Sequence, residues 1–282
     1  MEDAEVFTFP LTCLKTAARY LKREGVKVVV AFEFSGALLV RLLSQGVKAI
    51  SVDKRAPDHD GPSFQGDFAD LLGLQAWDMA FFVGPPCYQH MRHDKCLAAK
   101  IKDGRAYWAG ALNWRCLTWP NIKSVVVESP DVISHDMFDA TTLPGVTMQR
   151  FRSSWLGDTR DKFVTLVLKN VDLGPTPTEA GALGVELERR PSHREYDGDD
   201  SRDRARSTWL TMPKLADYVA TARIKDDGGT PEIDYAGDVM RHVLAKWRQK
   251  GYPVPPHPAN ATGRPLEPEA RAYQEVRGLG DG

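Results

Sequence analysis

The sequence lacks paired cysteines, long apolar runs and an excess of charge of either sign. Its four cysteines, Cys13, Cys87, Cys96 and Cys116, form no CxxC pair, which argues against a zinc ribbon or knuckle. No apolar run approaches the roughly 18–20 residues that span a bilayer, so we expect no membrane protein. The formal net charge of −1 excludes a strongly basic nucleic-acid-binding protein as a description of the whole chain.

The start of the chain also lacks the features of a secretory signal. Its first ten residues, MEDAEVFTFP, are acidic where a signal peptide is basic, so we expect a cytoplasmic protein with reduced thiols. With 282 residues, 42% of them hydrophobic and 27% charged, the chain has an ordinary globular composition. This length suits one large domain, or a domain with an appendage.

Strand-like and helix-like segments alternate over the first part of the chain. The run Lys27–Phe32 is rich in valine, as in a strand that is buried on both faces. By the same criteria we expect further strands at 47–52, 77–83, 123–127, 145–151 and 162–171, and helices at 11–24, 37–45, 67–72 and 103–118. This alternation predicts a doubly wound, mostly parallel, Rossmann-like α/β sheet.

The composition changes after Pro175 and indicates three regions. We expect a Rossmann-like domain at 1–172, a small accessory or recognition region at 173–252 and a proline-rich tail at 253–282. Charged and Gly/Pro-rich stretches predict loops at 54–66, 175–206 and 223–235, and helices are expected at 213–222 and 237–250.

Residues suited to a nucleoside follow the first two strands. Ser35 and Gly36 permit a tight turn and a close approach of the backbone to a ligand, although the segment is not a GxGxxG motif. Asp53 ends the second strand, near the spacing of about 20 residues expected for an acid that accepts ribose hydroxyls. Asp67 could reach an adenine amine with Phe68 packed on the ring, or it could cap a helix. The ribose role is favoured for Asp53, and the alternative is a residue that caps a loop.

Two further strand ends carry groups suited to chemistry. Gly84-Pro85-Pro86 is a stiff platform that directs the thiol of Cys87, which is either a nucleophile or a buried core residue. Glu128 ends the next strand and is either a surface glutamate or a group that pairs with a ring nitrogen and an exocyclic amine of a base. A carboxylate does not activate a thiol by charge, so Glu128 is expected to act on a substrate.

In this order, these segments resemble the cytosine-5 DNA methyltransferases, and more closely the short, divergent phage-encoded members of that superfamily. The resemblance is carried by Phe32–Gly36, Ser51–Lys54, Gly66-Asp67, Trp77-Asp78, Gly84–Cys87 and Glu128–Pro130, and extends more weakly to Pro175. It implies a class I S-adenosylmethionine-dependent methyltransferase fold. The implied donor-binding residues are Phe32, Glu33, Phe34, Ser35, Gly36, Asp53, Lys54, Asp67, Phe68, Gly84 and Pro85.

The resemblance also implies a covalent mechanism on C5 of cytosine. The thiolate of Cys87 would attack C6 while Glu128 holds the N3/N4 edge, and Arg150 and Arg152 would contact the base carbonyl or a phosphate. In a duplex the target base would have to be flipped out of the stack.

The resemblance implies cytosine-containing DNA as the partner. We expect a monomer in the cytoplasm of a bacterial or phage-infected cell. The alternatives are the same chemistry on a free pyrimidine nucleotide or RNA, methylation of an exocyclic amine, and a non-catalytic nucleic-acid-binding module. No metal is expected, because His90 and His93 have no third ligand at a convincing spacing.

Overall fold

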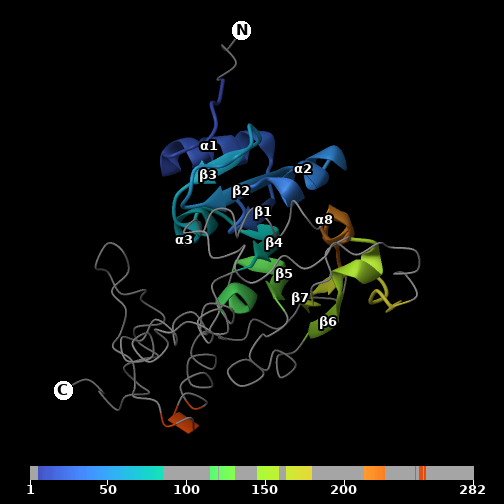
Figure 1. Ribbon diagram of the computed structural model, residues 1–282. Coiled ribbons are helices and arrows are strands. Elements are labelled where there is room, and N and C mark those ends of the chain that lie inside the picture. Colours follow the sequence, from blue (N-terminus) through green and yellow to red (C-terminus); the bar gives the residue numbers. More distant parts are fainter. Residues whose placement is uncertain are drawn as a thin grey trace, which may run out of the picture.

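The structure is a computed structural model that describes residues 6–84, 115–119, 121–130, 145–158, 163–179 and 213–225, together with residues 245, 248, 249 and 251; the side chains of 129 and 130 are not described. A seven-stranded sheet forms its centre, in the order β3-β2-β1-β4-β5-β7-β6 (Figure 1). The strands are β1 (Val28–Ala31), β2 (Ala49–Asp53), β3 (Ser63–Gln65), β4 (Trp77–Val83), β5 (Ile122–Pro130), β6 (Val146–Arg152) and β7 (Phe163–Lys169).

The five strands from β3 to β5 pair in parallel, and β7 runs antiparallel to both β5 and β6. The predicted doubly wound, mostly parallel α/β fold is therefore confirmed. The carboxyl ends of the parallel strands meet at one edge of the sheet, where a ligand site is expected in this class of fold.

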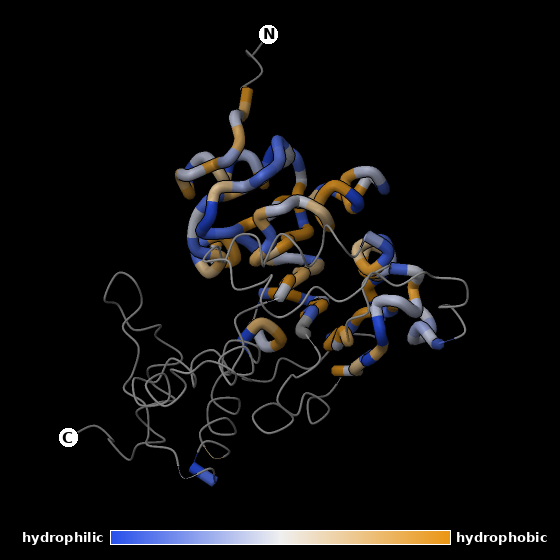
Figure 2. Tube along the Cα trace, viewed as in Figure 1, coloured by the Kyte–Doolittle hydropathy of each residue, from blue (hydrophilic) through white to orange (hydrophobic). Residues whose placement is uncertain are grey.

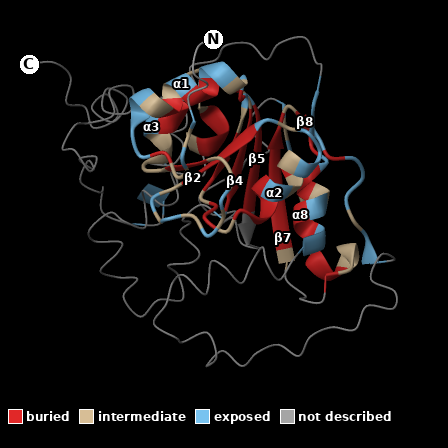
Figure 3. Ribbon diagram, turned by 90° about the horizontal axis from the view of Figure 1, so that it is seen from above, coloured by how far each residue is buried: buried red, intermediate tan, exposed pale blue. Residues whose placement is uncertain are grey.

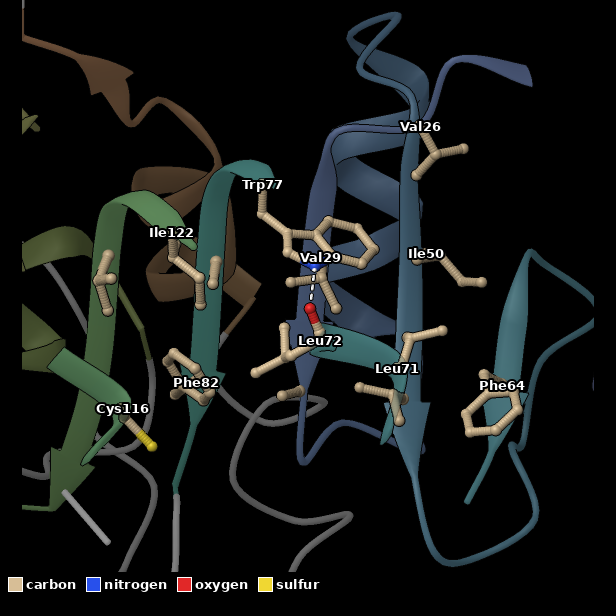
Figure 4. Close-up of a cluster of buried hydrophobic side chains, with 14 of the residues drawn as sticks. Val26, Val29, Ile50, Phe64, Leu71, Leu72, Trp77, Phe82, Cys116 and Ile122 are labelled. Atoms are coloured by element: carbon tan, nitrogen blue, oxygen red, sulfur yellow. Dashed lines mark hydrogen bonds between the residues drawn. The ribbon is translucent and has the colours of Figure 1, made fainter. Parts of the chain in front are cut away.

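Helices cover both faces of the sheet. On one face lie α1 (Leu14–Glu24) and α3 (Phe68–Leu72); on the other lie α2 (Ala37–Ser44) and α8 (Pro213–Ala220) (Figure 3). Apolar stretches gather around the sheet (Figure 2), and Trp77 sits within the core of the α1 face, where its indole N–H donates to the Leu72 carbonyl at 3.1 Å (Figure 4). Each core layer thus lies between one face of the sheet and the apolar sides of the helices that cover it.

Helix α8 comes from the region expected to be accessory, yet it packs against α2 and the sheet. The carboxylate of Asp158, which follows the short 3-10 helix η2 (Ser153–Leu156), accepts hydrogen bonds from the backbone N–H groups of Lys214 (2.9 Å) and Leu215 (3.1 Å). Burial raises the pKa of Asp158 to about 6, against the effect of these two bonds. This cap fixes the start of α8 on the body of the sheet.

One predicted loop was wrong in part, because residues 54–66 contain β3. The strand pairs with β2 from Ser63 to Gln65, and Leu11 covers its outer edge through backbone bonds of 2.8 Å to Ser63 and Gln65. A three-residue strand is too short for a period-two pattern to identify it. For the same reason β9 (Arg223–Ile224), which pairs with β8 (Val171–Asp172), was missed within the predicted loop 223–235.

No helix within these described ranges is long and apolar enough to cross a membrane.

Candidate nucleoside and catalytic site

The turn after β1 is closed by its own glutamate. Glu33 is 2% exposed, and its carboxylate accepts hydrogen bonds from the backbone N–H groups of Leu38 (2.6 Å) and Leu39 (3.2 Å) in the first turn of α2. Gly36, at the N-cap of α2, has a φ of +71°, which a residue with a side chain rarely adopts. Burial raises the pKa of Glu33 to about 7, although the two hydrogen bonds oppose this shift.

This cap limits what the helix end can bind. In dinucleotide-binding folds the pyrophosphate sits on the backbone N–H groups of the helix that follows the first strand. Here Glu33 already occupies two of these donors and places a carboxyl group at the positive end of α2. A phosphate would compete with this carboxylate, so the geometry favours a nucleoside ligand without phosphate at this position.

Asp53 lies at the neighbouring strand end, which is tied to the turn by a 2.9 Å bond from Phe32 N–H to the Val52 carbonyl. Its Oδ1 accepts from the backbone N–H (2.8 Å) and Nε (3.3 Å) of Arg55. Its Oδ2 makes no hydrogen bond or ion pair within the described part of the chain, and its side chain is only 9% exposed. Asp53 therefore caps its loop with one oxygen and leaves the other as an acceptor for a hydroxyl group.

Asp67 is the N-cap of α3, one of the two roles open from the sequence. Its Oδ1 accepts from the Ala69 N–H at 3.0 Å, and its Oδ2 lies 2.9 Å from the ammonium nitrogen of Lys54. Phe68 follows, with its ring centroid 4.8 Å from that of Phe32 and 5.7 Å from that of Trp119. The ends of β2 and β3 are thus joined by the ion pair between Lys54 and Asp67, and aromatic rings lie beside them.

Gly84, directly after β4, lies beside Glu128, which is within β5 and two residues before its end at Pro130. Gly84 N–H donates to the Glu128 carbonyl at 3.1 Å, and a Cβ built on Gly84 would lie 3.5 Å from Oε2 of Glu128. Glu128 is 3% exposed, so the alternative of a surface glutamate is wrong. Its carboxylate lies beside a backbone position that is three residues before Cys87. Cys87 and Pro85, like His90 and His93, lie outside the described residues.

Arg150 and Arg152 lie away from this carboxylate. They pair in register with Thr165 and Phe163, whereas Glu128 pairs with Leu166. Side chains in register share a face of a sheet and alternate along each strand, so both arginines lie on the face opposite Glu128. Their guanidinium carbons lie 5.2 Å and 4.1 Å from the centre of the Phe163 ring. The structure therefore groups the two arginines with each other, on one aromatic ring, and not with Glu128.

Two residues that support the site were not predicted. The Arg55 guanidinium lies 4.1 Å from the centre of the Phe34 ring while it contacts Asp53, and His59 packs against Gly36. Both belong to the segment predicted to be a loop, where no periodicity marks a side chain as buried. Within the described ranges no group of three or more metal-ligating side chains occurs.

Comparison with known proteins identifies no family. No protein-family profile and no curated protein matches the chain. Among solved structures, an E. coli prophage protein assigned as a DNA modification methyltransferase aligns at 12% identity and a TM-score of 0.36, over 51% of this chain and 46% of its own length. The delta-N METTL16 MTase domain aligns at 10% identity and a TM-score of 0.34, over 58% of this chain and 84% of its own. Neither likeness is close enough to assign an activity.

Proposed function

We propose that the protein is an S-adenosylmethionine-dependent methyltransferase that acts on C5 of cytosine in DNA. The observation that carries the donor assignment is the arrangement at the first two strand ends. There the helix end is closed to phosphate by Glu33, and Asp53 offers a nearly buried carboxylate oxygen to a ribose. S-adenosylmethionine is a nucleoside cofactor without phosphate, so these residues fit it better than they fit a dinucleotide.

In this proposal the chain's residues divide into a donor half and an acceptor half. Asp53 holds the ribose, and the rings of Phe32 and Phe68 border the adenine with Asp67 and Lys54 at the rim. Gly84 and Pro85 are assigned to the donor, and Gly84 leaves room next to the Glu128 carboxylate. When bound, the donor supplies an electrophilic methyl group on a sulfonium.

The acceptor half performs covalent catalysis. The Cys87 thiolate would form a bond to C6 of cytosine while Glu128 hydrogen-bonds the N4 amine and gives a proton to N3. The C5=C6 π pair then shifts to C4=C5 and the N3=C4 π pair takes the proton, which leaves an enamine that is nucleophilic at C5. C5 would take the methyl group as the methyl–sulfonium bond breaks and leaves the demethylated donor. Loss of the C5 proton to a base would then re-form the C5=C6 bond, expel the Cys87 thiolate from C6 and return the N3 proton to Glu128. The burial of Glu128 beside Gly84 supports this role, because a buried carboxyl group pairs strongly with a base edge.

The acceptor is proposed to be cytosine-containing DNA, bound by a monomer. Residues 1–172 would supply the catalytic domain and residues 173–252 the recognition region. Arg150 and Arg152 lie on the face away from Glu128, so of their two proposed contacts the one to a phosphate suits this position better than the one to the base carbonyl. A free pyrimidine nucleotide or RNA would be methylated by the same residues.

The test is a transfer assay with tritiated S-adenosylmethionine and, separately, DNA, RNA and dCMP. Label recovered as 5-methylcytosine in DNA is expected, and label in dCMP or RNA alone would move the substrate while keeping the chemistry. Cys87→Ser should abolish transfer and leave donor binding intact in calorimetry. Tight binding of NAD⁺ in place of S-adenosylmethionine would overturn the donor assignment.

A further inference from the structure

His59 is held in one neutral tautomer between β2 and α2. Its Nδ1 lies 3.1 Å from the backbone nitrogen of Gly61, whose N–H it accepts. Its proton is therefore on Nε2, which lies 3.2 Å from Oγ of Ser51 and donates to it. Two polar contacts on opposite sides fix both the position and the orientation of the ring.

The ring fills the space that a side chain at position 36 would occupy. A Cβ built on Gly36 would lie 2.5 Å from Cδ2, 2.6 Å from Cγ and 2.9 Å from Cβ of His59. The preceding residue of the same loop, Asp58, donates its N–H to the Phe34 carbonyl at 2.7 Å. The His59 loop therefore touches both ends of the turn Phe34–Gly36, once by a hydrogen bond and once by packing.

We propose that His59 is a positioning residue of the donor site, which holds the turn Phe34–Gly36 in its binding conformation through contact with Gly36. This inference rests on the proposed function, since it names the residue that shapes the donor half. Glu33 and the start of α2 flank the turn, so a shift of the imidazole would move the donor-facing backbone. A glycine with positive φ has many alternative conformations, and the ring restricts them.

The tautomer gives this role a pH signature. Protonation would place a hydrogen on Nδ1 against the Gly61 N–H and break that bond. The carboxylates that face the ring are Asp58 and Asp60 of its own loop, while β2 presents Ser51 and α2 presents Gly36, neither of which titrates. Burial lowers the pKa of His59 below its usual 6.5, and it outweighs the opposing effects of Asp60 and Asp58. Protonation of His59 below its lowered pKa should therefore weaken donor binding, whereas a change of affinity around pH 7 belongs to Glu33.

The experiment is a double-mutant cycle between positions 36 and 59, read by calorimetric titration with S-adenosylmethionine. His59→Ala should weaken binding by about 5- to 10-fold, and Gly36→Ala by about 30-fold or more, because it adds both strain and a clash. The double variant should bind no worse than Gly36→Ala, since removal of the ring relieves the clash. Losses that multiply, or a His59→Ala protein that binds like the parent, would overturn the proposal.

Two further variants distinguish a positioning role of His59 from a simple loss of stability. The amide oxygen of His59→Asn can accept from Gly61 N–H but cannot titrate. Donor binding should therefore stay within about threefold of the parent and lose the fall that protonation of His59 causes at acid pH, while a change around pH 7 from Glu33 remains in both proteins. Tyr218→Phe in α8 is the control. It removes the hydrogen bonds of the Tyr218 hydroxyl to the Gln149 side chain (2.7 Å) and to the Pro175 carbonyl (3.1 Å), and it should leave donor binding unchanged.

The outcomes also separate this inference from the proposed function. If the parent binds S-adenosylmethionine but positions 36 and 59 are uncoupled, only the role of His59 fails. If the parent binds no S-adenosylmethionine at any pH, the donor assignment and the role of His59 both fail.

Discussion

The proposed donor half and the proposed acceptor half of the site are built in different ways. Glu33, Asp53 and Asp67 each accept from backbone N–H groups a few residues further along the chain, so each carboxylate is held by its own loop. Glu128 is instead placed by the sheet, beside Gly84 from a strand distant in sequence. The donor half is thus fixed by local sequence and the acceptor half by topology, and substitutions in the two halves should affect different steps.

The largest effect is expected in the acceptor half. Glu128→Gln keeps the shape of the side chain but cannot give a proton to the base, so methyl transfer should fall by about 10²- to 10³-fold with donor affinity unchanged. Single-turnover transfer to DNA and calorimetry with the donor measure the two quantities.

The matched control for Glu128→Gln is Asp78→Asn, which removes an exposed ion pair of 2.7 Å to Lys123 at the opposite end of the same two strands. Asp78→Asn should change neither the rate of methyl transfer nor the donor affinity. Full activity of Glu128→Gln would place the proton donor elsewhere.

The next effect is on stability and concerns Glu33. Since its pKa is raised from 4.5 in the unfolded chain to about 7 when folded, stability from this group is fully present below pH 4.5 and is lost as the pH rises through 7. Relative to Glu33→Gln, the free energy of unfolding of the parent should fall by roughly 3 kcal/mol across this window.

Urea denaturation of both proteins at several pH values measures this difference. Asp158, whose pKa is also raised, titrates in both proteins, so its contribution to the free energy of unfolding cancels in the comparison. Parallel pH profiles of the two proteins would contradict the burial of an ionisable Glu33.

A smaller effect is expected at Asp53. Asp53→Asn can keep the loop hydrogen bond from Arg55 N–H but loses the charged acceptor, which should weaken donor binding by about 10- to 100-fold with little change in stability. Asp172→Asn is the control, because Asp172 makes the same kind of turn, accepting from Gly174 N–H at 2.7 Å. Equal donor affinity in the two variants would contradict the ribose role.

The smallest effect is expected at Lys54. Its ion pair with Asp67 is exposed, so Lys54→Ala should lower the free energy of unfolding by less than about 1 kcal/mol and donor affinity by about two- to fivefold. Thermal unfolding and calorimetry measure both. A loss of affinity beyond tenfold would instead indicate that Lys54 contacts the donor directly, and would make the donor half less dependent on backbone contacts than its geometry suggests.

The same division explains how much the sequence could predict. Asp53 lies at the end of β2 and Asp67 at the N-cap of α3, as the apolar run and the cap pattern predict. Glu128 was expected at the end of its strand, but β5 continues to Pro130, so Glu128 lies two residues inside it. The capping of α2 by Glu33 and the packing of His59 on Gly36 were not predicted, because both depend on the exact path of a loop. The opposite faces of Glu128 and the two arginines depend on strand register, which no single-strand pattern contains.

The insertion of β7 between β5 and β6 has a consequence for the newly made chain. As the ribosome releases Val146–Arg152, its partner strand is not yet present, because in the described part of the chain β6 pairs with β7, which is synthesised later. Until Phe163–Lys169 emerges, this segment has unpaired backbone groups that could associate with other chains. Arg150 and Arg152 place positive charge on this still unpaired segment, which disfavours its self-association while translation continues.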